Sequence, residues 1–540
     1  MKSDSNPIRA PALLAIRAPA LLAIRAPALL ALIPVSASLL VHSSVLSYDF
    51  RADDIAHFYD AANAGFLELV FTPAAGHNYL FRNTILYVFY RLFGLDPVPY
   101  FGMMVLSHSL NSFLLYRLLM SLSGRPLLAA FCSTLWGMSP VNQGALGWFS
   151  AFGSIHVGLF LLLLLSELLR LRKTASMPGA RAIASWYLLA FCMATSFAVG
   201  LALCIVLPAV AWLVFSEHPD RSRITRLLSP SALLVPAFCF LSYYIHAYLS
   251  GRPAAQPFSD ILKPDYWPTM LRLSADLYSY GLCSLLLGPI FAFGESGVVL
   301  GPLRDFNAEE LLVSAHAMAL PFLAWLAWTT GRSSVSRRRI VLAFLMLSVT
   351  SYAAISVGRA WLVDMFCIRI ECTVESCATV MRYHYVGPLM LAVLGGLIAD
   401  ETLVGRSWPF RRGLFLLAIW TVAMVYPCYK SASAMYAEKG EAFRQEYQRV
   451  MREIEDQIDR SKPGGAVYLE NRALESKLLF GFAGKFAALP GWAALFAITY
   501  PDNTVDGKKV YFVESDPEIL RMARSRPHTY INRLLVPRRR

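Results

Sequence analysis

The chain has 540 residues and a formal net charge of +13, with 56% hydrophobic and only 16% charged residues. A soluble domain typically carries about 25% charged residues, so this composition excludes an ordinary soluble enzyme, a disordered protein and a fibre. A mean hydropathy of +0.48 indicates a polytopic membrane protein instead. The excess of Lys and Arg is then explained by the positive-inside rule, and nucleic acid is not an expected partner.

An eight-residue repeat occupies the N-terminus, where IRAPALLA recurs at 8–15, 16–23 and 24–31. A repeat this short is not a solenoid unit, which needs about 20 or more residues. We therefore interpret residues 1–25 as a cytoplasmic low-complexity tail. An arginine in each copy precedes the first apolar span, 26–46, and no convincing cleavage site follows, which is typical of a signal anchor.

Further apolar stretches of about 17–22 residues are long enough to cross a bilayer. They are 101–122, 126–143, 152–170, 230–249, 311–330, 339–358, 382–400 and 413–430. Segment 183–216 is too long for one crossing and contains Gly200 and Pro208, so we expect two short helices that turn near 196–200. The total is about eleven transmembrane helices in a transmembrane domain that covers 26–430.

The charge of the loops sets the orientation. Clusters of Lys and Arg at 170–181, 221–226, 332–339 and 406–412 are all expected in the cytoplasm. A single crossing by 268–294 would place the cluster at 332–339 outside, so we expect an interfacial or re-entrant helix there. The N-terminus is then inside and the C-terminus outside.

This topology places three segments outside: a long first loop at 47–100, a loop at 359–381 and a C-terminal domain at 431–540. The C-terminal domain begins with a polar helix, expected at 434–460. Strand-like runs follow at 466–469 and 509–514, the second after the turn signal Asp506-Gly507. We expect a small extracytoplasmic α/β domain.

Two adjacent carboxylates, Asp53 and Asp54, follow the first span and are expected at the outer membrane surface. A transferase needs such groups there. One carboxylate can take the proton of an acceptor hydroxyl, and its neighbour can orient a base, a metal or a phosphate. On spacing alone, a solvated acidic turn is the simpler interpretation.

Three later stretches favour the catalytic interpretation. The first starts at His77 and includes Arg82, the run FGLDP at 93–97, His108 and Asn111. The second runs from SPVNQ at 139–143 to Trp148, and the third is MRYHYVGP at 381–388.

In their order, their spacing and the side of the membrane on which they are predicted, these stretches resemble the GT-C superfamily of integral membrane glycosyltransferases. The resemblance is to the protein O-mannosyltransferase-like branch, whose patterns are RP…L…FGL.P…H…N, HPV..E.V.W and SRY…P. In this chain Asn83 stands where the family has a proline, and Gln143 stands where an acid is common. The resemblance covers about residues 26–430, and it is firm only over 48–160 and 355–400.

The resemblance implies that Asp53 is the catalytic general base and that Asp54 assists it. The donor would be a sugar on a polyprenyl phosphate, and the acceptor a protein, lipid or glycan. Arg382 would bind the donor phosphate, because its guanidinium can hold two phosphate oxygens, and Arg359 is a second candidate. The alternative interpretation of Arg382 is an interfacial anchor for its span.

Further candidates for the substrate site are Arg82, His108, His384 and Gln143. For the two histidines, a hydrogen-bonded structural role is the simpler interpretation. No residue spacing indicates a metal site or a cofactor, although a divalent metal is left open. Cys367, Cys372 and Cys377 lack CxxC spacing, and a disulfide between two of them is also left open.

The sequence thus predicts an α-helical polytopic membrane protein with a GT-C-like fold, a lipid-linked sugar glycosyltransferase (hexosyl or pentosyl) of a bacterial inner membrane. An O-antigen ligase or polymerase is the alternative enzyme, but its key Arg and His residues lie in a large late loop. A lipid or sugar transporter (a flippase) is the alternative without catalysis. Transporters often show internal repeats and charges at mid-span, whereas the charges here cluster at span ends.

Overall fold

The computed structural model describes residues 29–50, 53–71, 79–174, 178–215, 228, 230–249, 263–264, 266–295, 308–370, 373–403, 410–436, 442–460, 466–470, 496, 500, 504–514 and 535–537. The tail predicted at 1–25 lies outside these residues. Nearly all regular structure in the described part is helical, and its short strands lie near the C-terminus.

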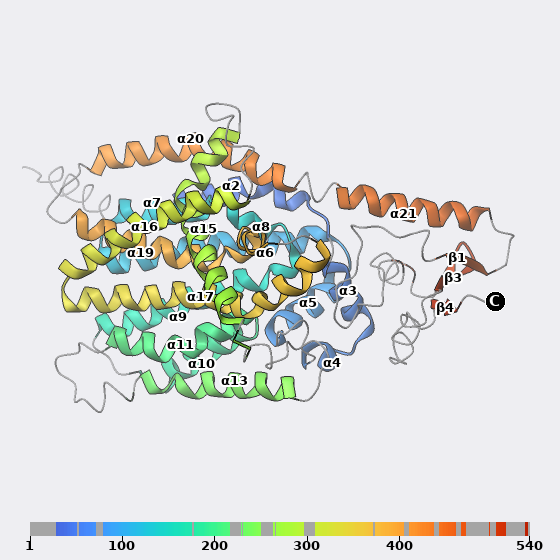
Figure 1. Cartoon of the computed structure of the whole chain (residues 1–540), viewed down its shortest axis with the longest axis horizontal. Helices are drawn as coiled ribbons and strands as arrows, with labels where there is room; N and C mark the ends of the chain where they lie inside the picture. Colours follow the sequence, from blue (N-terminus) through green and yellow to red (C-terminus); the bar gives the residue numbers. More distant parts are fainter. Residues whose placement is uncertain are drawn as a thin grey trace, which may run out of the picture.

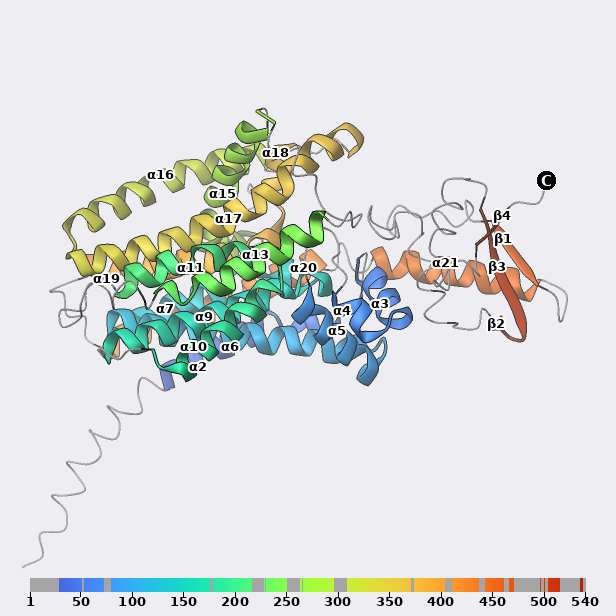
Figure 2. The ribbon, with the colours of Figure 1, turned by 90° about the horizontal axis from the view of Figure 1, so that it is seen from below.

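The long helices run side by side in one elongated bundle (Figure 1, Figure 2). They are α6 (Pro97–Ser123), α9 (Gly153–Lys173), α10 (Ala180–Ala194), α11 (Ala198–Phe215), α13 (Leu234–Leu249), α16 (Ala308–Arg332), α17 (Val335–Ile370), α19 (Val386–Thr402) and α20 (Phe410–Tyr436). The shorter α2 (Leu32–Val41) and α7 (Pro126–Gly137) pack against each other and against α6. Each apolar stretch predicted from the sequence therefore coincides with a helix, although α2 and α7 are shorter than expected.

Within the described residues, five helices are long and apolar enough to cross a membrane. They are Phe149–Lys173, Ala198–Phe215, Glu309–Arg332, Val335–Ala360 and Arg412–Ala434. Only 28% of the apolar window in α16 and 22% of that in α20 is buried within the protein. Apolar surface of this extent is stable in lipid but not in water. The prediction of an α-helical membrane protein is confirmed, while the number of eleven spans stays a prediction.

The turn between α10 and α11 lies where the sequence predicted it. A Cβ at Gly200 would lie 1.9 Å from the carbonyl oxygen of Met193, so only glycine allows the two helices to approach this closely. Pro208 lies inside α11 and does not end it. Segment 183–216 therefore forms the two short helices that were expected.

Helix α15 (Tyr266–Glu295) runs across the other long helices rather than along them (Figure 1). It packs against α16, α17 and α20. A Cβ at Gly281 would lie 1.7 Å from the Tyr352 hydroxyl oxygen, which shows how closely α15 crosses α17. This path agrees with the prediction that segment 268–294 is not a single membrane crossing. Whether the helix lies at the membrane interface or enters the membrane stays a prediction.

One end of the bundle, which we name the basic end, carries two of the four clusters expected in the cytoplasm, those at 170–181 and 332–339. The cluster at 221–226 and most of that at 406–412 lie outside the described residues. Arg125 Nε and Arg337 Nη2 bind opposite oxygens of Asp400, at 2.7 and 2.6 Å. Arg172, from the last turn of α9, donates to the Ser336 hydroxyl in the first turn of α17. The loops predicted at 170–181 and 332–339 therefore lie at the same end, as the topology requires.

The opposite end, which we name the loop end, carries the loop at 47–100 that the sequence predicts on the outer side, and we keep the name first outer loop for it (Figure 1). This loop contains the helices α3 (Asp53–Asn63), α4 (Phe66–Phe71) and α5 (Leu80–Phe93). An aromatic stack holds it to the bundle, since the Phe58 ring stacks on the Phe149 ring at 5.7 Å. The second outer loop, expected at 359–381, is shorter than predicted because α17 continues to Ile370 and α18 (Val374–Ala378) follows.

The C-terminal region forms a small α/β unit beyond the loop end (Figure 1, Figure 2). Helix α21 (Ala442–Asp459) precedes the strands β1 (Val467–Glu470), β2 (Thr504–Val505), β3 (Lys508–Glu514) and β4 (Leu535–Pro537). Strand β3 pairs in parallel with β1 and β4 and antiparallel with β2. Asp506 and Gly507 form the β2–β3 turn with φ of 46° and 76°. The expected helix and strands are present, and the boundary at 431 stays a prediction.

Candidate active site

Asp54 is buried completely at the start of α3, with none of its surface exposed. Its Oδ1 accepts hydrogen bonds from the backbone N–H of Ser150, at 2.6 Å, and from the Ser150 hydroxyl. A buried carboxylate requires such donors, and bonds to a charged acceptor are the stronger kind. Asp54 thereby fixes α3 to the short helix η3 (Phe149–Ala151).

Arg82 contacts the same serine from α5. Its Nη2 donates to the carbonyl oxygen of Ser150 at 3.3 Å, and its guanidinium carbon lies 4.3 Å from the centre of the Tyr79 ring. Arg82 is also fully buried. The backbone amide, hydroxyl and carbonyl of Ser150 are therefore all held by residues of the first outer loop.

The departure from the family pattern after Arg82 has a local role. Asn83 Nδ2 donates to the carbonyl oxygen of Leu69 at 2.8 Å, which joins α5 to α4. The backbone N–H of Asn83 donates to Tyr79 O at 2.6 Å, and a proline in this position lacks that donor.

Arg382 lies in η5 (Met381–Tyr383), with its guanidinium carbon 4.5 Å from the centre of the Trp148 ring. The guanidinium carbon of Arg382 also lies 5.2 Å from the centre of the Tyr383 ring. The guanidinium carbon of Arg359 lies 5.4 Å from the centre of the same ring. Such stacking orients a guanidinium and leaves the N–H groups at its edge able to bind an anion. Neither arginine forms an ion pair with a described residue.

These contacts join the three stretches of sequence that predicted a site. Trp148 and Ser150 belong to one segment, which receives Asp54 and Arg82 from the first outer loop and Arg382 from the late stretch. The helix α8 (Gln143–Leu146), which precedes this segment, packs directly on η5. Side chains from distant parts of the sequence thus meet at the loop end of the bundle.

The two neighbouring carboxylates are placed differently. Asp53 is the first residue of α3, and its side chain lies outside the described part of the structure. Asp54 is shielded from solvent, and one of its oxygens already accepts two hydrogen bonds from Ser150. A carboxylate in that setting is better suited to orienting a loop than to taking a proton from a substrate.

Gln143 lies in a buried hydrogen-bonded network beside the first span. Its Oε1 is 3.0 Å from His42 Nδ1, and its Nε2 donates to the Tyr48 hydroxyl. His42 Nε2 is in turn 3.2 Å from the carbonyl oxygen of Gly137. Because Gln143 is buried, an acid in its place would introduce a charge into this network. Its role in the substrate site stays a prediction.

His108 is buried with hydrogen-bond partners at both ring nitrogens. Its Nε2 lies 2.9 Å from the carbonyl oxygen of Gly137, which can only accept, so Nε2 carries the proton. The Tyr385 hydroxyl then donates to Nδ1 at 2.9 Å, and Asn111 Nδ2 donates to that hydroxyl at 3.0 Å.

His384 is bound in the same manner. Its Nε2 donates to the carbonyl oxygen of Ala378 at 2.7 Å, and the Tyr352 hydroxyl lies 3.3 Å from Nδ1. Both histidines are placed as the structural interpretation expects, and a role for either in substrate binding stays a prediction.

No group of three or more His, Cys, Asp or Glu side chains is placed to hold a metal ion in the part of the chain that the structure describes. The disulfide left open among Cys367, Cys372 and Cys377 falls partly on residues outside that part.

Sequence reasoning missed Ser150 and did not connect Trp148 with Arg382. The available signal was the motif that ends at Trp148, because Ser150 comes only two residues later. A serine has no pattern of its own that reveals a carboxylate partner in a distant helix. Tyr383 was also missed as the shared neighbour of Arg359 and Arg382.

No family model and no curated protein matches the chain. Among solved structures, it is similar to ArnT from Cupriavidus metallidurans bound to undecaprenyl phosphate, with 14% identity and a TM-score of 0.40 over 94% of this chain and 89% of that one. It is also similar to the Archaeoglobus fulgidus oligosaccharyltransferase in complex with Zn and sulfate, with 13% identity and a TM-score of 0.38 over 81% of this chain and 60% of that one.

Proposed function

We propose that this protein is a GT-C-type glycosyltransferase that moves a hexose or pentose from a polyprenyl phosphate to an acceptor at the loop end. One observation carries the proposal. The three stretches that resemble the family's motifs meet on residues 148–150, where Ser150 binds Asp54 and Arg82, and Trp148 stacks on Arg382. A resemblance between scattered motifs gains weight when the fold brings them into one cluster.

The donor phosphate binds at Arg382 and Arg359 in this proposal. Both guanidinium groups lie beside Tyr383, and neither is neutralised by a described carboxylate. The leaving group is an anionic polyprenyl phosphate, so cations fixed beside it stabilise the negative charge that develops in the transition state. An arginine can hold two phosphate oxygens at once, which also orients the bond that breaks.

The proton of the acceptor hydroxyl goes to Asp53. The acceptor oxygen then attacks the anomeric carbon of the sugar, and the bond from that carbon to the phosphate oxygen breaks. The electron pair of that bond leaves with the polyprenyl phosphate. Asp54 keeps the start of α3 in place through its two bonds to Ser150, so that the neighbouring Asp53 is positioned for the reaction.

We place the reaction on the outer face of a bacterial inner membrane. The basic end is then cytoplasmic under the positive-inside rule, and the loop end faces outward. The exposed apolar faces of α16 and α20 contact lipid, which also carries the isoprenoid tail of the donor.

The proposal is tested with the purified full chain in proteoliposomes that contain a polyprenyl-phosphate sugar labelled in the sugar. A membrane extract supplies lipid and glycan acceptors. We expect labelled acceptor and free polyprenyl phosphate to form together, and both to fall in the Arg382→Ala variant. If labelled lipid only exchanges between leaflets, with no free polyprenyl phosphate, the protein is a flippase and the proposal is wrong.

A further inference from the structure

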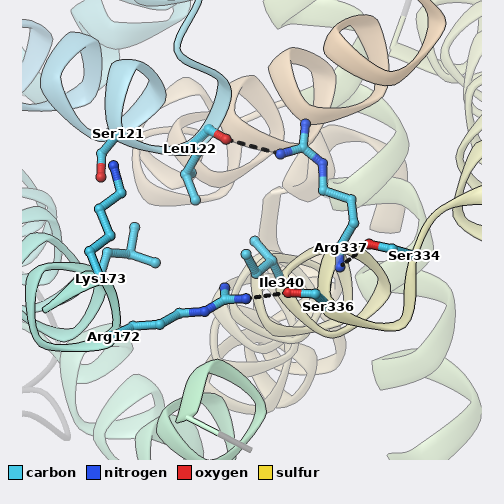
Figure 3. Close-up of a pocket in the computed structure, with 9 residues that line it drawn as sticks. Ser121, Leu122, Arg172, Lys173, Ser334, Ser336, Arg337 and Ile340 are labelled. Carbon is cyan, nitrogen blue, oxygen red and sulfur yellow. Dashed lines mark hydrogen bonds between the residues drawn. The ribbon is translucent and has the colours of Figure 1, made fainter. Parts of the chain in front are cut away.

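A cavity of about 400 Å³ lies at the basic end, between the ends of α6 and α9 and the start of α17 (Figure 3). Three cations border it, with Arg172 and Lys173 on one side and Arg337 on the other (Figure 3). Hydroxyl groups of Ser121, Ser334 and Ser336 also line it. No carboxylate is among the described residues that form its wall.

Arg337 is built into the wall of this cavity. Its side chain is only 14% exposed, and it donates to the carbonyl oxygens of Leu122 and Leu397, at 3.1 Å each, and to Asp400. Its Nε is buried without a hydrogen-bond partner among the described residues. Asp400 is shared with Arg125, so one carboxylate balances two guanidinium groups. Positive charge therefore remains in excess around the cavity.

The start of α17 adds to this excess. The first N–H groups of a helix lack intrahelical acceptors and give its N-terminus a partial positive charge, which favours anions nearby. The first turn of α17 contains no acidic residue, and instead Arg337, Arg338 and Arg339 follow at once. The positive-inside rule explains cations in a loop, but it does not explain an arginine at a helix N-terminus that is partly buried and hydrogen-bonded to two carbonyl groups.

We propose that this cavity binds a phosphate group, as a monoester or a diester. The guanidinium and ammonium groups on two sides, with serine hydroxyls beside them, suit phosphate oxygens. The apolar side chains of Leu122, Leu169 and Ile340 complete the wall and suit the ester carbons. The phosphate belongs either to an acidic phospholipid of the adjacent leaflet or to a soluble phosphate compound. This site lies at the opposite end of the bundle from the candidate active site and does not depend on the proposed function.

The test compares two double variants that remove the same charge. Arg172→Gln with Lys173→Gln empties one side of the cavity. The control variant, Arg170→Gln with Arg181→Gln, removes two cations from the same loop region that do not line the cavity. Arg170 is exposed and paired with Glu167, and Arg181 is exposed. Nanodiscs of phosphatidylcholine with added phosphatidylglycerol supply the lipid, and native mass spectrometry counts the bound lipid. Inorganic phosphate and pyrophosphate are titrated separately in detergent.

Cations that contact the bound phosphate contribute more to its binding than cations on the open surface, so we expect the cavity variant to bind about 30-fold more weakly. The control variant should stay within about threefold of the wild type. Selective loss of phosphatidylglycerol identifies the lipid as the source, and selective loss of inorganic phosphate or pyrophosphate identifies a soluble phosphate.

Equal weakening in both double variants, or no binding of any of these anions to the wild type, overturns the proposal. Thermal unfolding checks that both variants are folded. Lys173→Gln alone is the second variant, because Lys173 is exposed and forms no ion pair with a described residue. It should weaken binding about fivefold.

Discussion

Gly144 and Arg382 are in direct backbone contact. A Cβ at Gly144 would lie 2.4 Å from the backbone nitrogen of Arg382 and 2.4 Å from the carbonyl carbon of Met381. No other residue type fits at this distance, because the peptide unit between Met381 and Arg382 occupies the space that a side chain would need. The contact sets α8 against η5, and it therefore sets the distance at which Trp148 can stack on the Arg382 guanidinium.

Replacing this glycine should push η5 away from α8 and so disturb the candidate site. We expect Gly144→Ala to lower the free energy of unfolding by about 1–3 kcal/mol, since overpacking forces the backbone to move. Gly395→Ala is the matched control, because a Cβ there has no neighbour within 4 Å and alanine favours the helix. Thermal unfolding in detergent measures both variants. A Gly144→Ala protein as stable as the wild type would show that the two segments do not pack as described.

Arg382 should bind the donor phosphate both through its positive charge and through the planar guanidinium, which can hold two phosphate oxygens. We expect Arg382→Ala to weaken the binding of polyprenyl phosphate by about 10–100-fold, as for a lost charge-assisted hydrogen bond. Arg382→Lys should recover only part of this affinity, because lysine keeps the charge but cannot hold two oxygens or stack on Trp148. Titration with polyprenyl phosphate in detergent measures both.

Arg332→Lys is the control for that experiment. Arg332 also stacks on a tryptophan, with its guanidinium carbon 4.7 Å from the Trp328 ring, but it ends α16 at the basic end. Its substitution should leave donor affinity unchanged. If Arg382→Ala binds polyprenyl phosphate normally, Arg382 is an interfacial anchor of its span.

Ser150→Ala removes the hydroxyl donor to Asp54 and leaves the backbone amide of residue 150. We expect a loss of about 1–3 kcal/mol in the free energy of unfolding, because the buried carboxylate loses a hydrogen bond. Ser166→Ala in α9 is the control, since among the described residues that hydroxyl bonds to the carbonyl oxygen of Leu162 in its own helix. If both variants melt at the same temperature, the Asp54–Ser150 contact does not hold α3 in place.

Most of the helical bundle could be predicted from the sequence, because a long apolar run specifies a helix in lipid without reference to distant residues. Helices α6, α9 and α19 are examples of such runs. The extension of α17 to Ile370 was not predicted, since it passes polar residues such as Arg359 and Asp364 that are typical of a loop. The helices α3 to α5 were also hidden, because each is short and only partly apolar.

The candidate site was predictable as a set of residue types but not as a set of contacts. The motifs pointed to Asp54, Arg82 and Arg382, whereas their meeting on residues 148–150 depends on how α8 packs against η5. The cavity at the basic end shows the same limit. The charge pattern of the sequence placed Arg337 in a cytoplasmic loop, and only the packing of α17 against α19 shows it partly buried beside Asp400.

Two exposed residues at opposite ends test the predicted topology. Lys173 lies at the basic end, and Asp506 lies in the turn between β2 and β3. We expect a membrane-impermeant maleimide to label Asp506→Cys in intact cells and Lys173→Cys only after permeabilisation. Labelling in the reverse pattern would invert the orientation and place the candidate site in the cytoplasm.

The final prediction separates the two neighbouring carboxylates. Asp53→Asn is nearly isosteric and removes the proposed proton acceptor, so folding and donor binding should survive. A general base typically contributes about 10²–10⁴-fold in rate, which corresponds to about 3–5 kcal/mol of barrier, and we expect a loss of that size in transfer. Asp54→Asn should instead lower the free energy of unfolding by about 1–3 kcal/mol, because its bonds to Ser150 become bonds between neutral groups.

Two quantities are measured on each variant: the rate of transfer from the labelled donor in proteoliposomes, and the temperature of thermal unfolding. The four values assign the roles of the two carboxylates. We expect Asp53→Asn to be stable and slow, and Asp54→Asn to be less stable and slowed to a smaller extent. If Asp54→Asn abolishes transfer while Asp53→Asn turns over normally, Asp54 is the base and its burial must be relieved when substrate binds. If neither variant loses activity, the start of α3 is not catalytic, and the cluster around Ser150 serves only to hold the first outer loop on the bundle.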